Sequence, residues 1–179
     1  MKNLVIALGC LLTLSACQSG ENKVAAETKT ATPYTVPDDA AITQAVHDAY
    51  TAISFKKGEQ PRFDEIKNYF IPQTQMINFR ADTAGFTNLP AFVNLYKQFV
   101  NTNHIRLFYE EELYGKNEQF GKIAHRISTY KTYLNTMDTI AERGVNSFQL
   151  IKTPRGWKVS SIIWDVEKPT LKVPAYYLK

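Results

Sequence analysis

The chain has 179 residues, of which 44% are hydrophobic and 12% aromatic, and its formal net charge at pH 7 is +4. This apolar content is enough for a packed core, so the composition excludes a fully disordered chain. No apolar run reaches the ~18 residues of a transmembrane helix. The small basic excess is scattered along the chain, so no nucleic-acid partner is expected.

The first sixteen residues have the layout of a bacterial export signal, in which Lys2 precedes the apolar stretch 4–14. The segment ends in Leu14-Ser15-Ala16-Cys17, which resembles the lipobox of bacterial lipoproteins. The resemblance implies a signal peptide over residues 1–16 and a lipid on Cys17 that anchors the chain to a membrane. In a Gram-negative host, Gln18 implies an outer-membrane location facing the periplasm. The alternative is an ordinary signal with a chance cysteine.

Four segments are expected along the chain. Residues 1–16 are the signal, and residues 17–37 are the lipidated cysteine and a flexible tether rich in Ser, Thr, Ala, Lys and Glu. Residues 38–167 are the folded domain, and residues 168–179 are an extended tail that docks on it. Because Cys10 leaves with the signal and Cys17 carries lipid, the domain has no thiol chemistry.

Three helices are predicted at the start of the domain. Apolar residues recur with helical spacing from Ile42 to Ile53 after a capping aspartate, and Lys57-Gly58 ends that helix. Pro61 and Pro72 bound the second helix, and Pro90 lies in the first turn of the third. A short strand over residues 76–79 and a polar loop over residues 81–88 separate these two helices.

Four strands are predicted after the helices, over residues 105–114, 120–133, 145–152 and 157–166. The turns between them, at Gly115-Lys116-Asn117, at residues 135–138 and at Pro154-Arg155-Gly156, indicate an antiparallel meander. Helices followed by a run of strands are typical of an α+β fold with the helices on one face of the sheet.

Three stretches resemble the nuclear transport factor 2-like superfamily, which includes ketosteroid isomerase-like and polyketide cyclase-like proteins. They are residues 144–150, Gly156-Trp157-Lys158-Val159 and Ile162-Ile163-Trp164-Asp165. The resemblance covers about residues 40–167. It implies a strongly curved, cone-shaped antiparallel sheet, N-terminal helices packed on it, a pocket between them and a homodimer through the outer sheet face. It does not fix the activity, because the superfamily contains both enzymes and binding domains.

Strand parity selects the catalytic candidates Glu111 and His125, because alternate residues of a strand share a face. Glu111 lies in phase with the apolar residues of the first long strand, and His125 with Ile123 and Ile127. A desolvated carboxylate and a histidine on consecutive strands suit acid/base work. The alternatives are an exposed or salt-bridged Glu111 and a hydrogen-bonded core histidine.

Four further residues are candidate ligand-binding residues: Asn146, Tyr130, Arg143 and Trp164. Asn146 would donate a hydrogen bond to a ligand oxygen or tie down a strand end. Tyr130 would serve a ligand if its face is the inner one, or pack structurally. Arg143 would bind an anion or form a salt bridge, and Trp164 is most simply a core or rim aromatic.

No metal and no cofactor are expected. His47, His104 and His125 are far apart, and the sequence contains no glycine-rich phosphate-binding motif.

Three functions from different classes remain. The domain binds a small apolar or amphipathic molecule at the cell envelope, or it is an acid/base enzyme of isomerase, cyclase or dehydratase type, or it is a protein–protein interaction domain. A buried Glu111–His125 pair beside a cavity would favour the enzyme. A cavity without convergent titratable groups would favour the binding module. A cone whose interior is filled by side chains, together with an exposed apolar patch, would favour the interaction domain.

Overall fold

The computed structural model describes residues 34–81 and 83–179. The predicted signal segment 1–16, the lipidation site Cys17 and most of the predicted tether lie outside the described residues. Thr35–Lys179 make up one structural unit with its own core. Among the described residues, no helix has the length and apolar content needed to cross a membrane.

Two of the three predicted helices are confirmed. The helix α1 (Asp39–Ile53) buries the predicted apolar stripe, and α2 (Leu89–Thr102) begins where the Asn88 side chain accepts a hydrogen bond from the backbone N–H of Ala91 at 3.0 Å. The second predicted helix is wrong in extent. A 3-10 helix, η1 (Phe63–Tyr69), gives way to a strand before Pro72, which lies where the register of that strand shifts.

Six strands form one sheet in the order β2-β1-β6-β5-β4-β3. They are β1 (Phe70–Asn78), β2 (Gly85–Asn88), β3 (Phe108–Phe120), β4 (Ile123–Leu134), β5 (Glu142–Thr153) and β6 (Gly156–Val166). The strands β3 to β6 form the predicted antiparallel meander, whereas β1 runs parallel to β6. The predicted loop 81–88 contains β2, which pairs with β1.

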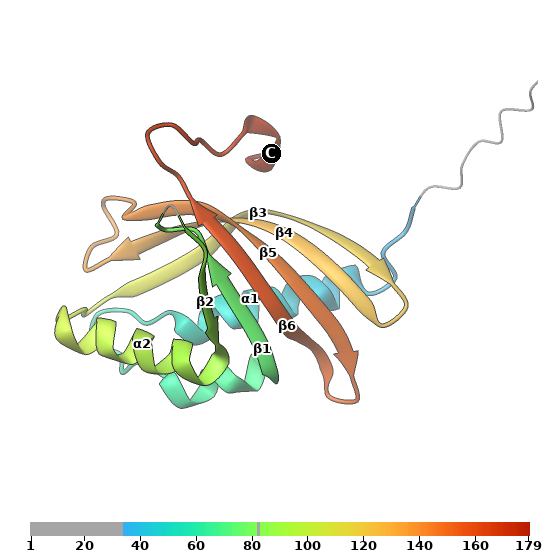
Figure 1. Cartoon of the computed structure of the whole chain (residues 1–179), viewed down its shortest axis with the longest axis horizontal. Coiled ribbons are helices and arrows are strands. Elements are labelled where there is room, and N and C mark those ends of the chain that lie inside the picture. The colour runs from blue at the N-terminus through green and yellow to red at the C-terminus, as the bar shows by residue number, and fades with distance from the viewer. Residues whose placement is uncertain (1–33, 82) are drawn as a thin grey trace, which may run out of the picture. The chain divides into compact units, whose positions relative to one another are not determined.

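The sheet curves around the helices, which lie on one side of it, and the C-terminal tail lies on the other side (Figure 1). We call the side that faces the helices the inner face. The core lies between this face and the helices, and includes Ile42, Val46, Ile66, Met76, Phe148, Leu150 and Val159. The tail contains a 3-10 helix, η2 (Ala175–Tyr177). On the outer face, the ring of Tyr177 stacks on the ring of Tyr114, with the ring centroids 6.3 Å apart. The architecture is the predicted α+β class.

The turn predicted at Gly115-Lys116-Asn117 is wrong, because β3 continues to Phe120 and the chain reverses at Gly121, which has φ +55°. A β-carbon on Gly115 would clash with the guanidinium group of Arg126 on β4. Gly115 therefore provides space for a side chain of the neighbouring strand. A register shift between Glu112 and Tyr114 keeps both Glu112 and Gly115 on the inner face.

Candidate functional site

A cavity of about 470 Å³ lies between the inner face of the sheet and the helices. Its walls are largely apolar and aromatic, and are contributed by α1, α2 and all six strands. The apolar lining includes Ile53, Phe70, Met76, Phe92, Leu95, Tyr96, Phe99, Phe108, Leu134, Phe148, Ile162 and Trp164. This volume lies within the range of small-molecule sites.

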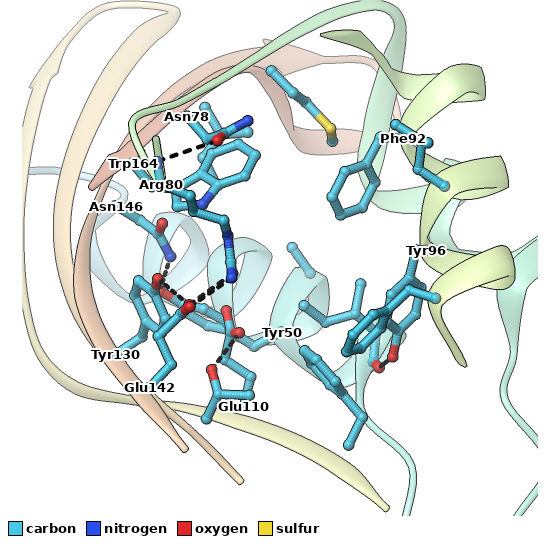
Figure 2. Close-up of a pocket in the computed structure, with 18 of the residues that line it drawn as sticks. Tyr50, Asn78, Arg80, Phe92, Tyr96, Glu110, Tyr130, Glu142, Asn146 and Trp164 are labelled. Carbon is cyan, nitrogen blue, oxygen red and sulfur yellow. Dashed lines mark hydrogen bonds and ion pairs between the residues drawn. The ribbon is translucent and has the colours of Figure 1, made fainter. Parts of the chain in front are cut away.

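Polar side chains gather at one end of the cavity, across from Phe92 and Tyr96 of α2 (Figure 2). Arg80 and Glu142 form a two-point ion pair there, with Nη1–Oε2 and Nη2–Oε1 distances of 2.6 and 2.7 Å. Tyr130 donates its hydroxyl proton to Oε1 of Glu142 at 2.8 Å. The charge of Glu142 is thus compensated within the site.

Glu110 is the second carboxylate of this polar end, and it is partly buried. Its Oε2 accepts a hydrogen bond from Thr132 at 2.8 Å. Burial raises the pKa of Glu110 to about 7, and the charge of Glu142 adds to the rise, while Thr132 and Arg80 oppose it. Glu110 therefore exchanges its proton near neutral pH, as an acid/base group must.

A directed chain of hydrogen bonds leads from the cavity wall into the domain. Asn146 donates from Nδ2 to the Tyr50 hydroxyl at 2.8 Å, and Ser128 donates to Oε2 of Glu112 at 2.5 Å. The Tyr50 and Ser128 oxygens are 2.7 Å apart. Because Ser128 has one proton and gives it to Glu112, Tyr50 donates to Ser128. This chain fixes the amide orientation of Asn146.

The chain ends at a buried ion pair between Glu112 and Arg126, with N–O distances of 2.5 and 2.8 Å. Arg126 also donates to Oδ1 of Asn117 at 2.7 Å and to Thr43 at 3.0 Å, so it joins β3, β4 and α1. Burial pushes the pKa of Glu112 up, but the hydrogen bonds from Arg126 and Ser128 outweigh it and hold that pKa below its usual range.

No protein-family model and no curated protein sequence matches this chain. Solved structures do match. A protein of unknown function with a cystatin-like fold from Nostoc punctiforme is 12% identical, with a TM-score of 0.59, over 77% of this chain and 96% of that chain. A nuclear transport factor 2-like protein of unknown function from Shewanella baltica is 16% identical, with a TM-score of 0.52, over 75% and 98%.

The domain has the nuclear transport factor 2-like fold. A candidate scytalone dehydratase from Novosphingobium aromaticivorans has the same architecture, at 12% identity and a TM-score of 0.58, over 77% of this chain and 90% of that chain. Identities this low establish the fold alone. The chemistry of this domain must therefore be argued from its own cavity.

The predicted acid/base pair of Glu111 and His125 is not assembled in this domain. Both side chains lie on the outer face, where Glu111 forms an ion pair with Lys131 at 2.8 Å and Nε2 of His125 lies 2.9 Å from Oγ of Ser147. In the register of β3 and β4, Glu111 is opposite Lys131, and His125 is opposite Glu118. Neither lines the cavity between the sheet and the helices, because the inner face is the face with opposite parity.

Three of the four predicted ligand-binding residues, Tyr130, Asn146 and Trp164, line the cavity. Their role in binding stays a prediction. Arg143 does not line it, because its side chain forms an ion pair with Glu167 at 2.9 Å, as its salt-bridge alternative expected. Sequence reasoning missed the polar residues Tyr50, Arg80, Glu110, Thr132 and Glu142. Within the described part of the chain, no cluster of three or more His, Cys, Asp or Glu could hold a metal ion.

Proposed function

We propose that the domain binds a small molecule with a largely apolar body, and that a lipid on Cys17 holds the protein at the cell envelope, at the periplasmic face of the outer membrane in a Gram-negative host. The observation that carries the binding function is the cavity of about 470 Å³, whose apolar walls meet polar groups at one end. Apolar walls supply affinity, and a few placed polar groups supply orientation.

Blocking the cavity mouth is expected to weaken binding. Ala141 is exposed and lines the cavity from the loop between β4 and β5, so a tryptophan in its place would obstruct the entrance without disturbing the core. We expect the Ala141→Trp variant of the full chain to bind the neutral dye Nile red at least about tenfold more weakly, a loss of about 1.4 kcal/mol. Fluorescence titration measures this affinity.

The matched control is Met137→Trp, which places the same side chain in the same loop at an exposed residue that does not line the cavity. It should bind Nile red as the wild type does. Native mass spectrometry of the three full-length proteins gives a second readout, since a retained natural ligand should be missing from Ala141→Trp alone. Equal dye binding by the two variants would show that the cavity is not the binding site.

The membrane anchor is tested by Cys17→Ser. If Cys17 carries the lipid, the wild type expressed in an exporting bacterium should fractionate with membranes and incorporate an alkyne-labelled fatty acid. The variant should do neither. Cys10→Ser is the control, because Cys10 lies in the predicted signal and is not expected to be lipidated. Labelling of the Cys17→Ser protein would refute the anchor.

An acid/base enzyme is a second candidate function, with Glu110 in the role predicted for Glu111 and His125. The specific observation is that Glu110 lines the cavity and has its pKa raised to about 7. As a base, its carboxylate would take a proton from the bound molecule and return it elsewhere, as isomerisation or dehydration requires. A ligand recovered unchanged after incubation with the wild type would contradict this function.

A docking role for the outer face stays a prediction. The predicted homodimer would cover exposed apolar residues there, among them Leu113 and Ile163. The cavity on the opposite face gives the small-molecule function the stronger support.

A further inference from the structure

The polar end of the cavity contains more carboxylates than cations. Among the described lining residues, Arg80 is the only lysine or arginine, and both of its terminal nitrogens bind Glu142. No described cationic side chain lies within ion-pair distance of Glu110, which accepts a hydrogen bond from Thr132. When Glu110 is ionised, the lining of the cavity therefore carries one uncompensated negative charge.

The hydroxyl groups beside Glu110 present oxygen lone pairs and no spare protons. The hydroxyl proton of Tyr130 is donated to Glu142, and that of Thr132 is donated to Glu110. Each hydroxyl has a single proton, so both groups can only accept a further hydrogen bond. A ligand with N–H donors finds acceptors at this end of the cavity, whereas a ligand carboxylate would meet the negative charge of Glu110.

Among the described titratable residues that line the cavity, Glu110 is the one with a pKa of about 7. Three tyrosines face it, Tyr50 from α1, Tyr96 from α2 and Tyr130 from β4, and burial raises the pKa of each further above its usual alkaline value. The charged groups around it are the paired Glu142 and Arg80, with Glu112 two residues away on the same strand and paired with Arg126 and with His47 of α1. The charge of the polar end therefore follows Glu110.

A row of aromatic rings, the aromatic wall, suits the body of an organic cation. The rings of Phe92 and Tyr96 lie across the cavity from the polar end (Figure 2), and Trp164 and Phe108 extend the row at its two ends, with successive ring centroids 5.2 to 6.5 Å apart. The Tyr96 hydroxyl donates to the Ile53 carbonyl at 2.5 Å, so its ring contributes apolar surface. Aromatic faces attract cations as well as apolar groups.

We propose that the cavity selects an amphipathic amine, whose ammonium group binds Glu110 and whose apolar body lies against the aromatic wall. This inference rests on the proposed binding function and adds a ligand class to it. The ammonium group would supply the missing positive charge and donate to Glu110 and the Tyr130 oxygen. Thr132 would keep the Glu110 carboxylate in place.

Three probes with one carbon frame test the inference: phenylbutylamine, phenylbutanol and phenylbutyrate, each displacing Nile red from the full chain. At about pH 8.5, where Glu110 is ionised and the amine is still protonated, the amine should bind at least about tenfold more tightly than the alcohol. At about pH 5, where Glu110 is neutral, this preference should fall to about twofold or less. The carboxylate should bind most weakly at about pH 8.5.

Glu110→Gln should remove the amine preference and its pH dependence while the alcohol binds as before. Glu111→Gln is the matched control, since it removes the neighbouring carboxylate of the same strand on the outer face and should change neither. Equal affinities of amine and alcohol at about pH 8.5, tighter binding of the carboxylate, or a preference that survives in Glu110→Gln would overturn the amine inference and leave cavity binding intact. A wild type that does not bind Nile red would instead overturn the proposed function.

Discussion

Replacing Arg126 by methionine should lower the free energy of unfolding by about 3–5 kcal/mol. The side chains of Arg126 and Glu112 are only 5% and 8% exposed, and each satisfies the charge of the other. Methionine keeps an apolar stem of similar length but removes the guanidinium partner of the buried Glu112 carboxylate, which then has only Ser128 and the half-exposed His47, at 3.0 Å, beside it. Removing one partner of a buried ion pair costs more than replacing the whole pair. Urea unfolding at neutral pH measures the loss.

Two control variants separate this effect from general damage. Arg126→Met combined with Glu112→Leu should recover most of the stability, since an apolar pair can replace a buried ion pair at little cost. Arg62→Met removes an exposed pair with Glu65, whose side chains are 45% and 53% exposed, and should cost less than about 1 kcal/mol. A similar loss in Arg126→Met and Arg62→Met would contradict the assigned role of Arg126.

Glu110→Gln should make the apo protein more stable above neutral pH. The pKa of Glu110 is about 7 in the folded protein, against 4.5 for an unperturbed glutamate as in the unfolded chain. Between these two pH values the folded state therefore binds more protons than the unfolded state. The contribution of Glu110 to the free energy of unfolding is therefore fully present below its pKa in the unfolded state, and it is lost as pH rises through its pKa in the folded state. For a partly buried group we expect a loss on the order of 2 kcal/mol between about pH 4.5 and about pH 8.

Glutamine cannot ionise, so the Glu110→Gln protein should lack this loss and exceed the wild type by a similar amount at about pH 8. Melting temperatures and urea midpoints of the ligand-free protein at about pH 5 and about pH 8 measure the difference. Glu111→Gln, on the outer face, should keep the wild-type pH dependence. An unchanged pH dependence in Glu110→Gln would show that Glu110 is not held in a desolvating site.

The features that the sequence could predict are those with a local signal. The apolar spacing of α1, Pro90 at the start of α2 and the short turn before Gly156 each depend on a few neighbouring residues. Asn146 could be assigned to the cavity face because it alternates with Phe148, which is buried in the core. These elements, and the inner-face position of Asn146, can therefore be predicted from the local sequence pattern.

The inner faces of β3 and β4 could not be predicted from the sequence, because they carry polar and charged side chains whose partners lie on the neighbouring strand. Glu110 accepts a hydrogen bond from Thr132, and Glu112 forms an ion pair with Arg126; these residues become neighbours only through the strand register. An inner face with these side chains looks polar, so parity selected the opposite face and Glu111. Arg80 and Glu142, 62 residues apart, have no local signal at all.

The parallel pairing of β1 with β6 has a consequence for how the domain is completed. β6 is the last strand in the chain but lies between β1 and β5, and it pairs Val159 with Phe70 across most of the domain. During synthesis, which starts at the N-terminus, β1, β2 and α2 are therefore made first. The β1–β2 hairpin cannot pair with the rest of the sheet until β6 has been made. Contacts so distant in sequence form late because their loop-closure entropy must be overcome first. The cavity is therefore enclosed only when β6, which contributes Ile162 and Trp164 to its lining, pairs between β1 and β5.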